Sequence, residues 1–324
     1  MGGSFLSLKK VLVTGGAGYI GTSLVPILIE NGFSVRVFDD LSYSDYGIKK
    51  HLNEVELIEG AVSDFDLLKK SLNGVDAVIH LAGTSGDPSC DLDPVKCSQD
   101  NYHSTKKIVE YCKELRINRL AFASSCSVYG AQDGMVDESS KPNPLTLYAR
   151  TKLDSEKEIT SIEGGSALRL STLFGGSGRT RCDLVVNLLT CHAFQNGKVM
   201  LFGGDQWRPL LDVKDAARAF FMAITLEKKR VNGVFNVGST DQNLKVKEIA
   251  YLLGKEIKDI DINIHPVDRD ARSYKVCFEK IKQEWGYSAE YSVVDGIREI
   301  RDLLERKVID DWKNPIYSTR GRIL

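Results

Sequence analysis

Tyr148 and Lys152 are the two residues of this chain whose types and spacing suggest chemistry most directly. On a helix, side chains four positions apart share a face, so the phenol and the ammonium group converge. A nearby cation lowers the pKa of a phenol, and the phenolate can then take a proton from a substrate hydroxyl. Taken alone, however, this spacing is common, and an exposed helix face explains it better.

A serine-rich segment, SSCSVYG at residues 124–130, follows a predicted strand and strengthens the chemical interpretation. A hydroxyl at the end of this strand could hydrogen-bond the oxygen from which Tyr148 removes a proton. A plain serine-rich turn is the alternative. Together, the two motifs favour proton transfer, with a hydride leaving the same carbon.

A glycine-rich turn supplies a place for the hydride acceptor. The strand predicted over Lys10–Thr14 runs into GGAGYIG at residues 15–21. Gly15 permits a tight turn, Gly18 lets the backbone approach a pyrophosphate, and Gly21 lets the next helix pack on the strand. The amino end of that helix presents free N–H groups to the anion. The context favours a dinucleotide site over an ordinary glycine turn.

Asp39 ends the second predicted strand, 24 positions after Gly15. A carboxylate there accepts hydrogen bonds from the ribose hydroxyls and repels a 2′-phosphate, which favours NAD over NADP. The neighbouring Asp40 could be only a solvated carboxylate.

Strands alternating with helices must position these groups. The alternation predicts parallel βαβ units and an α/β fold with a Rossmann-type doubly wound parallel sheet. Predicted strands cover Lys10–Thr14, Ser34–Phe38, Val55–Glu59, Ala77–Leu81, Arg119–Ser124, Ala167–Leu170 and Val234–Val237. Predicted helices cover Tyr19–Asn31, Asp64–Leu72, Asn101–Leu115, Tyr148–Thr160 and Asp212–Leu226.

The pattern loosens after about residue 175, which predicts a smaller C-terminal substrate-binding lobe interleaved with the sheet domain. We expect residues 1–175 to form the cofactor-binding domain, with 212–240 returning to it. Residues 176–211 and 241–308 would form the substrate lobe, and 309–324 an irregular C-terminal tail.

Composition excludes several classes of protein. The 324 residues include 43 Lys plus Arg and 44 Asp plus Glu, and this net charge of −1 gives no general reason to bind nucleic acid or an anionic membrane. No apolar run is long enough to span a bilayer. The seven cysteines are scattered, so we expect neither a disulfide framework nor a zinc site, and no metal. A cytoplasmic location is predicted, since no signal peptide precedes the first strand.

These motifs together resemble the extended short-chain dehydrogenase/reductase family, which includes the NAD-dependent sugar-nucleotide epimerases and dehydratases. The resemblance covers residues 8–305 and is carried by TGGAGYIG at 14–21, Asp39, HLAG at 80–83, Asn101, SSCSVYG at 124–130 and YARTK at 148–152.

The resemblance implies roles for individual residues. Tyr148 would be the general acid/base, Lys152 would bind the nicotinamide ribose and lower the pKa of Tyr148, and Ser125 would complete the catalytic group. Cofactor-binding residues would be Gly15, Gly18, Tyr19, Ile20, Gly21, Asp39, Asp40, Leu41, Ser42, Ala61, Val62, Leu81, Ala82, Gly83, Asn101, Ser124, Tyr148 and Lys152. Substrate-binding residues would be Thr84, Ser125, Asn187, Arg208 and Arg272, the last from the segment DARSY at 270–274.

Three positions depart from the family pattern. Ser127 stands where the 4,6-dehydratases carry an acidic proton donor, which argues against dehydration. Ala61 replaces an aspartate beside the adenine, and Thr172 replaces an asparagine after the strand that follows the catalytic helix.

The leading hypothesis is therefore an NAD-dependent epimerase that transiently oxidises C4 of a nucleotide-diphosphate sugar. A sugar-nucleotide 4-dehydrogenase or ketoreductase would use the same site. A non-catalytic NAD-sensing scaffold is the third hypothesis, and the intact Tyr148, Lys152 and Ser125 speak against it. As in relatives, we expect a homodimer in which the helices at 101–115 and 148–160 form a four-helix bundle.

Overall fold

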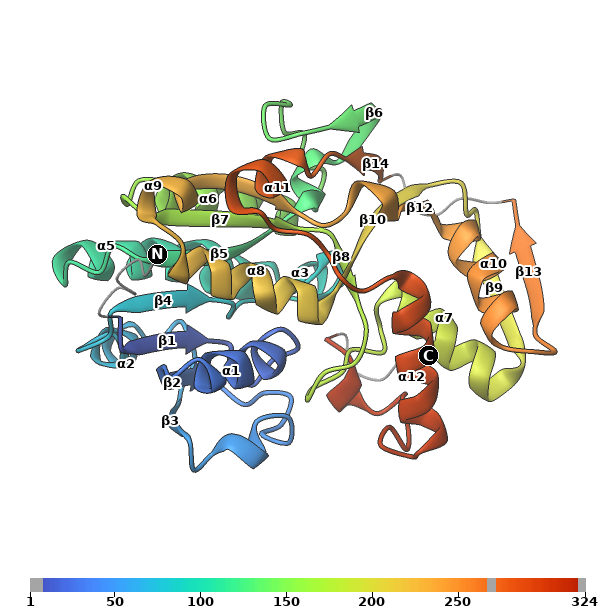
Figure 1. The fold of residues 1–324 in the computed structure, drawn as a ribbon, viewed down its shortest axis with the longest axis horizontal. Coiled ribbons are helices and arrows are strands. Elements are labelled where there is room, and N and C mark those ends of the chain that lie inside the picture. Colours follow the sequence, from blue (N-terminus) through green and yellow to red (C-terminus); the bar gives the residue numbers. More distant parts are fainter. Residues whose placement is uncertain (1–7, 267–271, 320–324) are drawn as a thin grey trace.

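A parallel sheet forms the centre of the molecule in the computed structural model, which describes residues 8–266 and 272–319 (Figure 1). Within these residues the sheet has seven strands in the order β11-β7-β5-β4-β1-β2-β3, and every neighbouring pair is parallel. The strands are β1 (Lys10–Thr14), β2 (Ser34–Asp39), β3 (Val55–Glu59), β4 (Ala77–His80), β5 (Leu120–Ser125), β7 (Gly165–Leu170) and β11 (Gly233–Val237). The predicted doubly wound α/β fold is confirmed.

Helices cover both faces of this sheet. On one face, α1 (Gly21–Glu30) packs against α8 (Val213–Thr225). On the other face lie α2 (Phe65–Ser71), α5 (Ser104–Glu114) and α6 (Leu147–Ile159). Successive side chains of a strand point to opposite faces, and those of β1 therefore enter two separate cores, Val11 and Val13 in one and Leu12 in the other. Burial on both faces explains the continuous apolar run in the sequence.

The helices α5 and α6 pack on each other and on the sheet. Ile108, Val109 and Cys112 of α5 are buried in the core beneath β4 and β5, so they serve packing within one chain. A π-helical turn (Gln99–His103) precedes α5.

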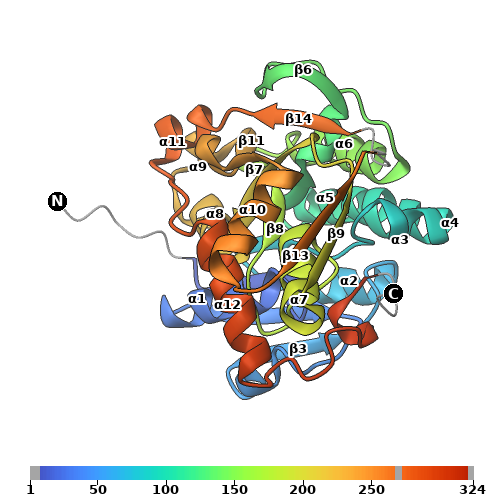
Figure 2. The ribbon, with the colours of Figure 1, turned by 90° about the vertical axis from the view of Figure 1, so that its right-hand side faces the viewer.

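A second group of elements lies at the carboxyl edge of the sheet. A small sheet has the order β12-β10-β8, and β9 pairs with β13, as Figure 2 shows. These strands are β8 (Thr172–Phe174), β9 (Lys198–Phe202), β10 (Trp207–Asp212), β12 (Asn243–Lys245) and β13 (Asp261–His265). The helices α7 (Val185–Asn196), α10 (Val246–Glu256) and α12 (Val293–Glu305) share a separate apolar core with them.

Shorter elements complete the described fold. The strands β6 (Ala131–Val136) and β14 (Ser273–Val276) pair in parallel. The remaining helices are α3 (Asp87–Leu92), α4 (Pro94–Ser98), α9 (Lys228–Val231) and α11 (Glu279–Trp285). No helix in the described residues is long and apolar enough to cross a membrane.

The scattered cysteines predicted no disulfide framework, but one pair of them is bridged in the described residues. Cys90 and Cys97 form a buried disulfide, with their Cα atoms 5.0 Å apart. They lie seven positions apart in sequence, but α3 and α4 meet at Asp93 and turn back on each other, which brings the two residues within the reach of a disulfide. The bridge packs against the amide of Asn101.

Candidate active site

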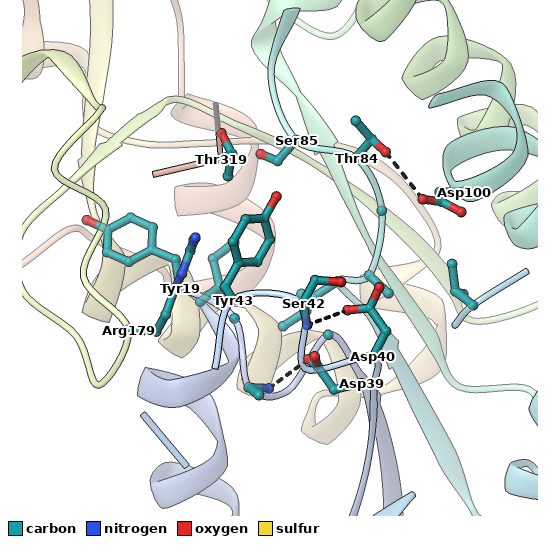
Figure 3. Close-up of a pocket in the computed structure, with 18 of the residues that line it drawn as sticks. Tyr19, Asp39, Asp40, Ser42, Tyr43, Thr84, Ser85, Asp100, Arg179 and Thr319 are labelled. Atoms are coloured by element: carbon teal, nitrogen blue, oxygen red, sulfur yellow. Dashed lines mark hydrogen bonds between the residues drawn. The ribbon is translucent and has the colours of Figure 1, made fainter. Parts of the chain in front are cut away.

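A cavity opens where the carboxyl ends of β1, β2 and β4 meet the turn before α1 (Figure 3). Parallel sheets bind ligands at this edge. The cavity gathers residues from distant parts of the sequence. Among the predicted cofactor and substrate residues, those that line it are Gly15, Gly18, Tyr19, Ile20, Asp39, Asp40, Ser42, Ala61, Val62, Leu81, Ala82, Gly83 and Thr84.

The glycine-rich turn needs glycine for steric reasons at two positions. Gly15 has a φ of +72°, and an added Cβ would lie 2.7 Å from the backbone nitrogen of Ala82. An added Cβ on Gly21 would lie 2.5 Å from the Cα and the carbonyl oxygen of Gly16. The turn therefore holds α1 against β1, and the amino end of α1 faces the cavity.

We expect Gly21→Ala to lower the free energy of unfolding by about 1–3 kcal/mol, since backbone atoms must move to admit the methyl group. Urea unfolding measures the change. Ser23→Ala in the same helix is the matched control and should stay close to wild type. Equal stabilities of the Gly21 variant and the wild type would show that the turn can relax at no cost.

Asp39 is held rigidly at the cavity wall. Its two carboxylate oxygens accept hydrogen bonds from the main-chain nitrogens of Ala17 and Leu41, both at 2.9 Å. Burial raises the pKa of Asp39, and these two hydrogen bonds oppose the rise. The main-chain nitrogen of Ser42 donates to Asp40 at 3.1 Å. This arrangement fixes an acceptor where the ribose was predicted to bind.

Tyr148, Lys152 and Ser125 come together at the edge of β5 and the first turns of α6. Thr146 caps α6 through a 3.2 Å bond from the main-chain nitrogen of Ala149. The Lys152 ammonium lies 5.7 Å from the centre of the Tyr148 ring and 4.7 Å from that of Phe122. Tyr148 and Lys152 thus share one face of α6, as the spacing predicted.

The pKa of Tyr148 is raised to about 12, chiefly by burial and next by the charge of Asp87. Hydrogen bonding to Ser125 and Ser85 and the charge of Arg181 act in the opposite direction but do not outweigh burial. The expected lowering by Lys152 is therefore not the net result in this structure. Burial also lowers the pKa of Lys152 to about 8.

Two predicted cofactor residues, Ser124 and Asn101, do not line the cavity and instead hydrogen-bond to other protein groups. The Ser124 hydroxyl donates to Glu156 at 2.5 Å. The amide nitrogen of Asn101 donates to the carbonyl oxygen of Thr84 at 3.0 Å, while its oxygen leaves no room for a Cβ on Gly83. The remaining predicted cofactor residue, Leu41, contributes the main-chain bond to Asp39.

The predicted substrate residues beyond Thr84 and Ser125 fall into two groups. The Asn187 side chain is buried and bonds to Gly175, Tyr19 and the Arg181 carbonyl, so it holds the loop after β8. Arg208 and Arg272 lie together, because a guanidinium nitrogen of Arg208 donates to the Arg272 carbonyl at 2.5 Å. Asp270 and Ala271 of the predicted segment lie outside the described residues.

Several residues at the site were missed by sequence reasoning. Asp87 accepts a 2.5 Å hydrogen bond from Thr146 and pairs with Arg272. The missed residues that line the cavity include Ser85, Arg179, Arg181 and Thr319. The two arginines in GGSGRTR, just after a glycine-rich turn, were a visible signal for an anion site, whereas Asp87 and Thr319 offered none.

We expect Asp87→Asn to shift the alkaline-rising limb of the rate profile to lower pH. If the Tyr148 phenolate is the base, as the sequence predicts, removing the nearby negative charge lowers its pKa and favours the reactive form at lower pH. The measurement is kcat against pH, with Asp91→Asn on the same helix as control. An unchanged limb would mean that Asp87 does not set the charge state of Tyr148.

The half-buried Tyr148 and Ser125 and the buried Lys152, beside a glycine-turn cavity, indicate a dinucleotide-dependent α/β enzyme of the Rossmann type. The comparison with family models narrows this class. The model of the NAD-dependent epimerase/dehydratase family matches residues 11–238. The chain belongs to this family of enzymes, and NAD is its cofactor. The residues present fit NAD, since α1 offers amide donors and Asp39 an acceptor for ribose.

Two 4-epimerases from other organisms are similar to this chain over most of its length. A putative UDP-glucose 4-epimerase from Methanocaldococcus jannaschii is 30% identical over 303 residues, which cover 90% of this chain and 96% of the relative. A UDP-glucose 4-epimerase from Corynebacterium glutamicum is 27% identical over 87% of this chain and 92% of its own length.

Solved structures agree with the fold. The UDP-glucuronic acid 4-epimerase from Bacillus cereus, solved with UDP-glucuronic acid and NAD, is 26% identical with a TM-score of 0.82. The match covers 92% of this chain and 99% of that one.

Proposed function

We propose that this protein is an epimerase that inverts C4 of a nucleotide-diphosphate sugar through transient oxidation. The observation that carries the proposal is the shared helix face of the half-buried Tyr148 and the buried Lys152, whose ammonium lies 5.7 Å from the centre of the Tyr148 ring. The 4-epimerase relatives from Methanocaldococcus jannaschii and Corynebacterium glutamicum support it.

In the proposed reaction, Tyr148 accepts the proton of the C4 hydroxyl while Ser125 hydrogen-bonds to the same oxygen. The glycine-rich turn and Asp39 would hold NAD, which would supply a reversible hydride acceptor for C4. Lys152 holds the nicotinamide ribose and favours the phenolate. Tyr148 then gives its proton back as the hydride returns to the other face of the 4-keto sugar, so no net redox change results.

The sugar must turn over within the site without leaving. Arg208 lies on β10 and Arg272 immediately precedes β14, and the Arg208 guanidinium donates to the main-chain carbonyl of Arg272. Two arginines are well suited to bind a diphosphate at several oxygens. We infer that they hold the diphosphate while the sugar rotates.

Dehydration is not proposed, because Ser127 occupies the position of the acid. Its buried hydroxyl has no hydrogen-bond partner among the described residues. A hydroxyl is far too weak an acid to replace a carboxylic acid as the proton donor for elimination.

The test is incubation of the purified protein with a panel of UDP-, GDP-, CDP- and dTDP-hexoses without added cofactor. Chromatography with mass spectrometry separates the outcomes. A product of unchanged mass and new retention time supports epimerisation. A product two mass units lighter, at most stoichiometric with enzyme and accompanied by bound NADH, would instead indicate the 4-dehydrogenase. Loss of water would contradict the argument from Ser127.

We also propose the domain division and assembly predicted from sequence: a cofactor domain of 1–175 with 212–240, and a cytoplasmic homodimer through α5 and α6. Ile108, Val109 and Cys112 are buried within the chain, so they give no support to the dimer. The dimer is therefore proposed from the family resemblance. Sedimentation tests it, since a mass near the monomer value of 36.0 kDa would refute a dimer.

A further inference from the structure

Residues 309–319 return from α12 to the cofactor cavity, and Thr319 lines that cavity (Figure 3). Figure 2 shows this segment, in dark red, leaving the lower end of α12. Its first part is anchored by burial. Trp312 is 2% exposed and its ring lies 4.8 Å from that of His192 on α7, while Ile309 packs against α12. The path of this segment is therefore fixed by the core.

The last described residues of the segment bridge two walls of the cavity. The main-chain nitrogen of Cys182 donates to the carbonyl oxygen of Tyr317 at 2.8 Å. The Ser89 hydroxyl on α3 donates to the Thr319 carbonyl at 2.9 Å. Asp183 accepts bonds from the Thr319 main-chain nitrogen at 3.2 Å and from its hydroxyl at 3.0 Å. Residues 317–319 thus join α3 to the loop after β8.

Arg179, on that loop, is buried beside the amino end of α1. Its main-chain nitrogen donates to the Thr22 hydroxyl in the first turn of α1 at 3.1 Å, and its guanidinium lies 4.0 Å from the centre of the Tyr43 ring. One guanidinium nitrogen donates to the Ser318 carbonyl at 3.1 Å. Its Nε is buried without a hydrogen-bond partner among the described residues, a costly state unless a ligand accepts the bond.

The positive charge of Arg179 also lacks a paired negative group among the described residues. Asp183 neutralises the adjacent Arg181 through two hydrogen bonds of 2.9 Å, but among the described residues no carboxylate forms an ion pair with Arg179. Burial and then the charge of Arg181 lower the pKa of Arg179 to about 10, so it stays protonated at neutral pH. A buried cation is stable only with a compensating partner.

Arg179 lines the cavity next to the first turn of α1. Asp39, at one end, faces the predicted adenosine ribose, and Arg181 interacts electrostatically with Tyr148 at the other. Figure 3 shows Arg179 beside Tyr43. The diphosphate of a dinucleotide binds at the amino end of the helix that follows a glycine-rich turn, so Arg179 lies next to that predicted position.

We propose that residues 317–319 form a strap that holds Arg179 against the NAD diphosphate, opposite the α1 amides, and so keeps NAD bound between turnovers. This deepens the proposed function, since an epimerase regenerates NAD in every cycle and has no need to release it.

The test measures NAD release without any sugar nucleotide. Holoenzyme loaded with radiolabelled NAD is diluted into excess unlabelled NAD, and retained label is followed by filter binding. We expect Arg179→Met to speed release about 10- to 100-fold, the size of a lost charged hydrogen bond. Arg306→Met, an exposed arginine at the end of α12, should release NAD at the wild-type rate.

Ligand fragments separate a diphosphate contact from a general disturbance of the site. Arg179→Met should weaken ADP-ribose binding by a similar factor and leave adenosine binding unchanged. Release at the wild-type rate, or equal weakening for both fragments, would overturn the proposal. Because no sugar nucleotide is present, the result does not depend on which reaction the enzyme catalyses.

The strap itself is tested by a matched pair of chains. A chain ending at Tyr317 loses the Ser318 and Thr319 contacts and should release NAD faster, whereas one ending at Thr319 should behave as the full chain. Thr319→Val, in the full-length chain, should speed release about 2- to 10-fold through its lost hydroxyl bonds. If both Thr319→Val and the shorter chain release NAD at the wild-type rate, residues 317–319 do not help Arg179 to retain NAD, and the strap is refuted.

Discussion

Replacing Tyr148 with phenylalanine is expected to lower kcat by about 10²- to 10⁴-fold, the range attributed to a positioned general acid/base. The change removes one oxygen atom from a half-buried side chain, and it leaves the ring beside Lys152 in place. Turnover at saturating substrate is measured with the nucleotide sugar that the panel identifies.

The Tyr148 variant should still bind NAD, because the cavity around the glycine-rich turn is untouched. Bound NAD, measured after gel filtration, should match wild type. Tyr251→Phe, an exposed tyrosine on α10, is the control and should keep full activity. A Tyr148 variant within tenfold of wild type would refute its role as the base and revive the scaffold hypothesis.

Replacing Glu156 with glutamine is expected to lower the free energy of unfolding by about 3–5 kcal/mol, because it leaves the buried Arg169 charge without its partner. Two hydrogen bonds, of 2.9 and 2.8 Å, join the Arg169 guanidinium to the Glu156 carboxylate, and both side chains are almost fully buried. The pair links α6 to β7, and the Ser124 hydroxyl ties it to β5.

Urea unfolding followed by circular dichroism measures this loss. Asp154→Asn, two positions earlier on the exposed side of α6, removes a surface ion pair with Lys157 and should cost less than about 1 kcal/mol. A similar small change for Glu156→Gln would mean that the buried pair contributes nothing beyond its packing. A large loss would identify the pair as the support beneath Tyr148 and Lys152.

Local pattern was sufficient for the sheet and for the cofactor turn. The strand predicted at Lys10–Thr14 is β1 with the same bounds, and the helix predicted at Tyr148–Thr160 differs from α6 by one residue at each end. Apolar runs buried on both faces and side chains four apart on a helix depend on neighbours in sequence, so they can be read from it. The glycines predicted the β1–α1 turn, because residues with a Cβ do not fit at Gly15 and Gly21.

Contacts between distant segments were decided by the tertiary structure. Asp87 is brought to Thr146 and Arg272, 59 and 185 positions away, and no local pattern encodes that meeting. The hydrogen bond from the Arg181 guanidinium to the Thr319 hydroxyl likewise joins distant segments. The pKa of Tyr148 depends in the same way on the chain segments that bury it. The sequence by itself determined the fold class and the family, and it predicted the reactive residues. Only the folded chain decided their charge environment and what closes the cavity, because burial and long-range electrostatics depend on the positions of all segments together.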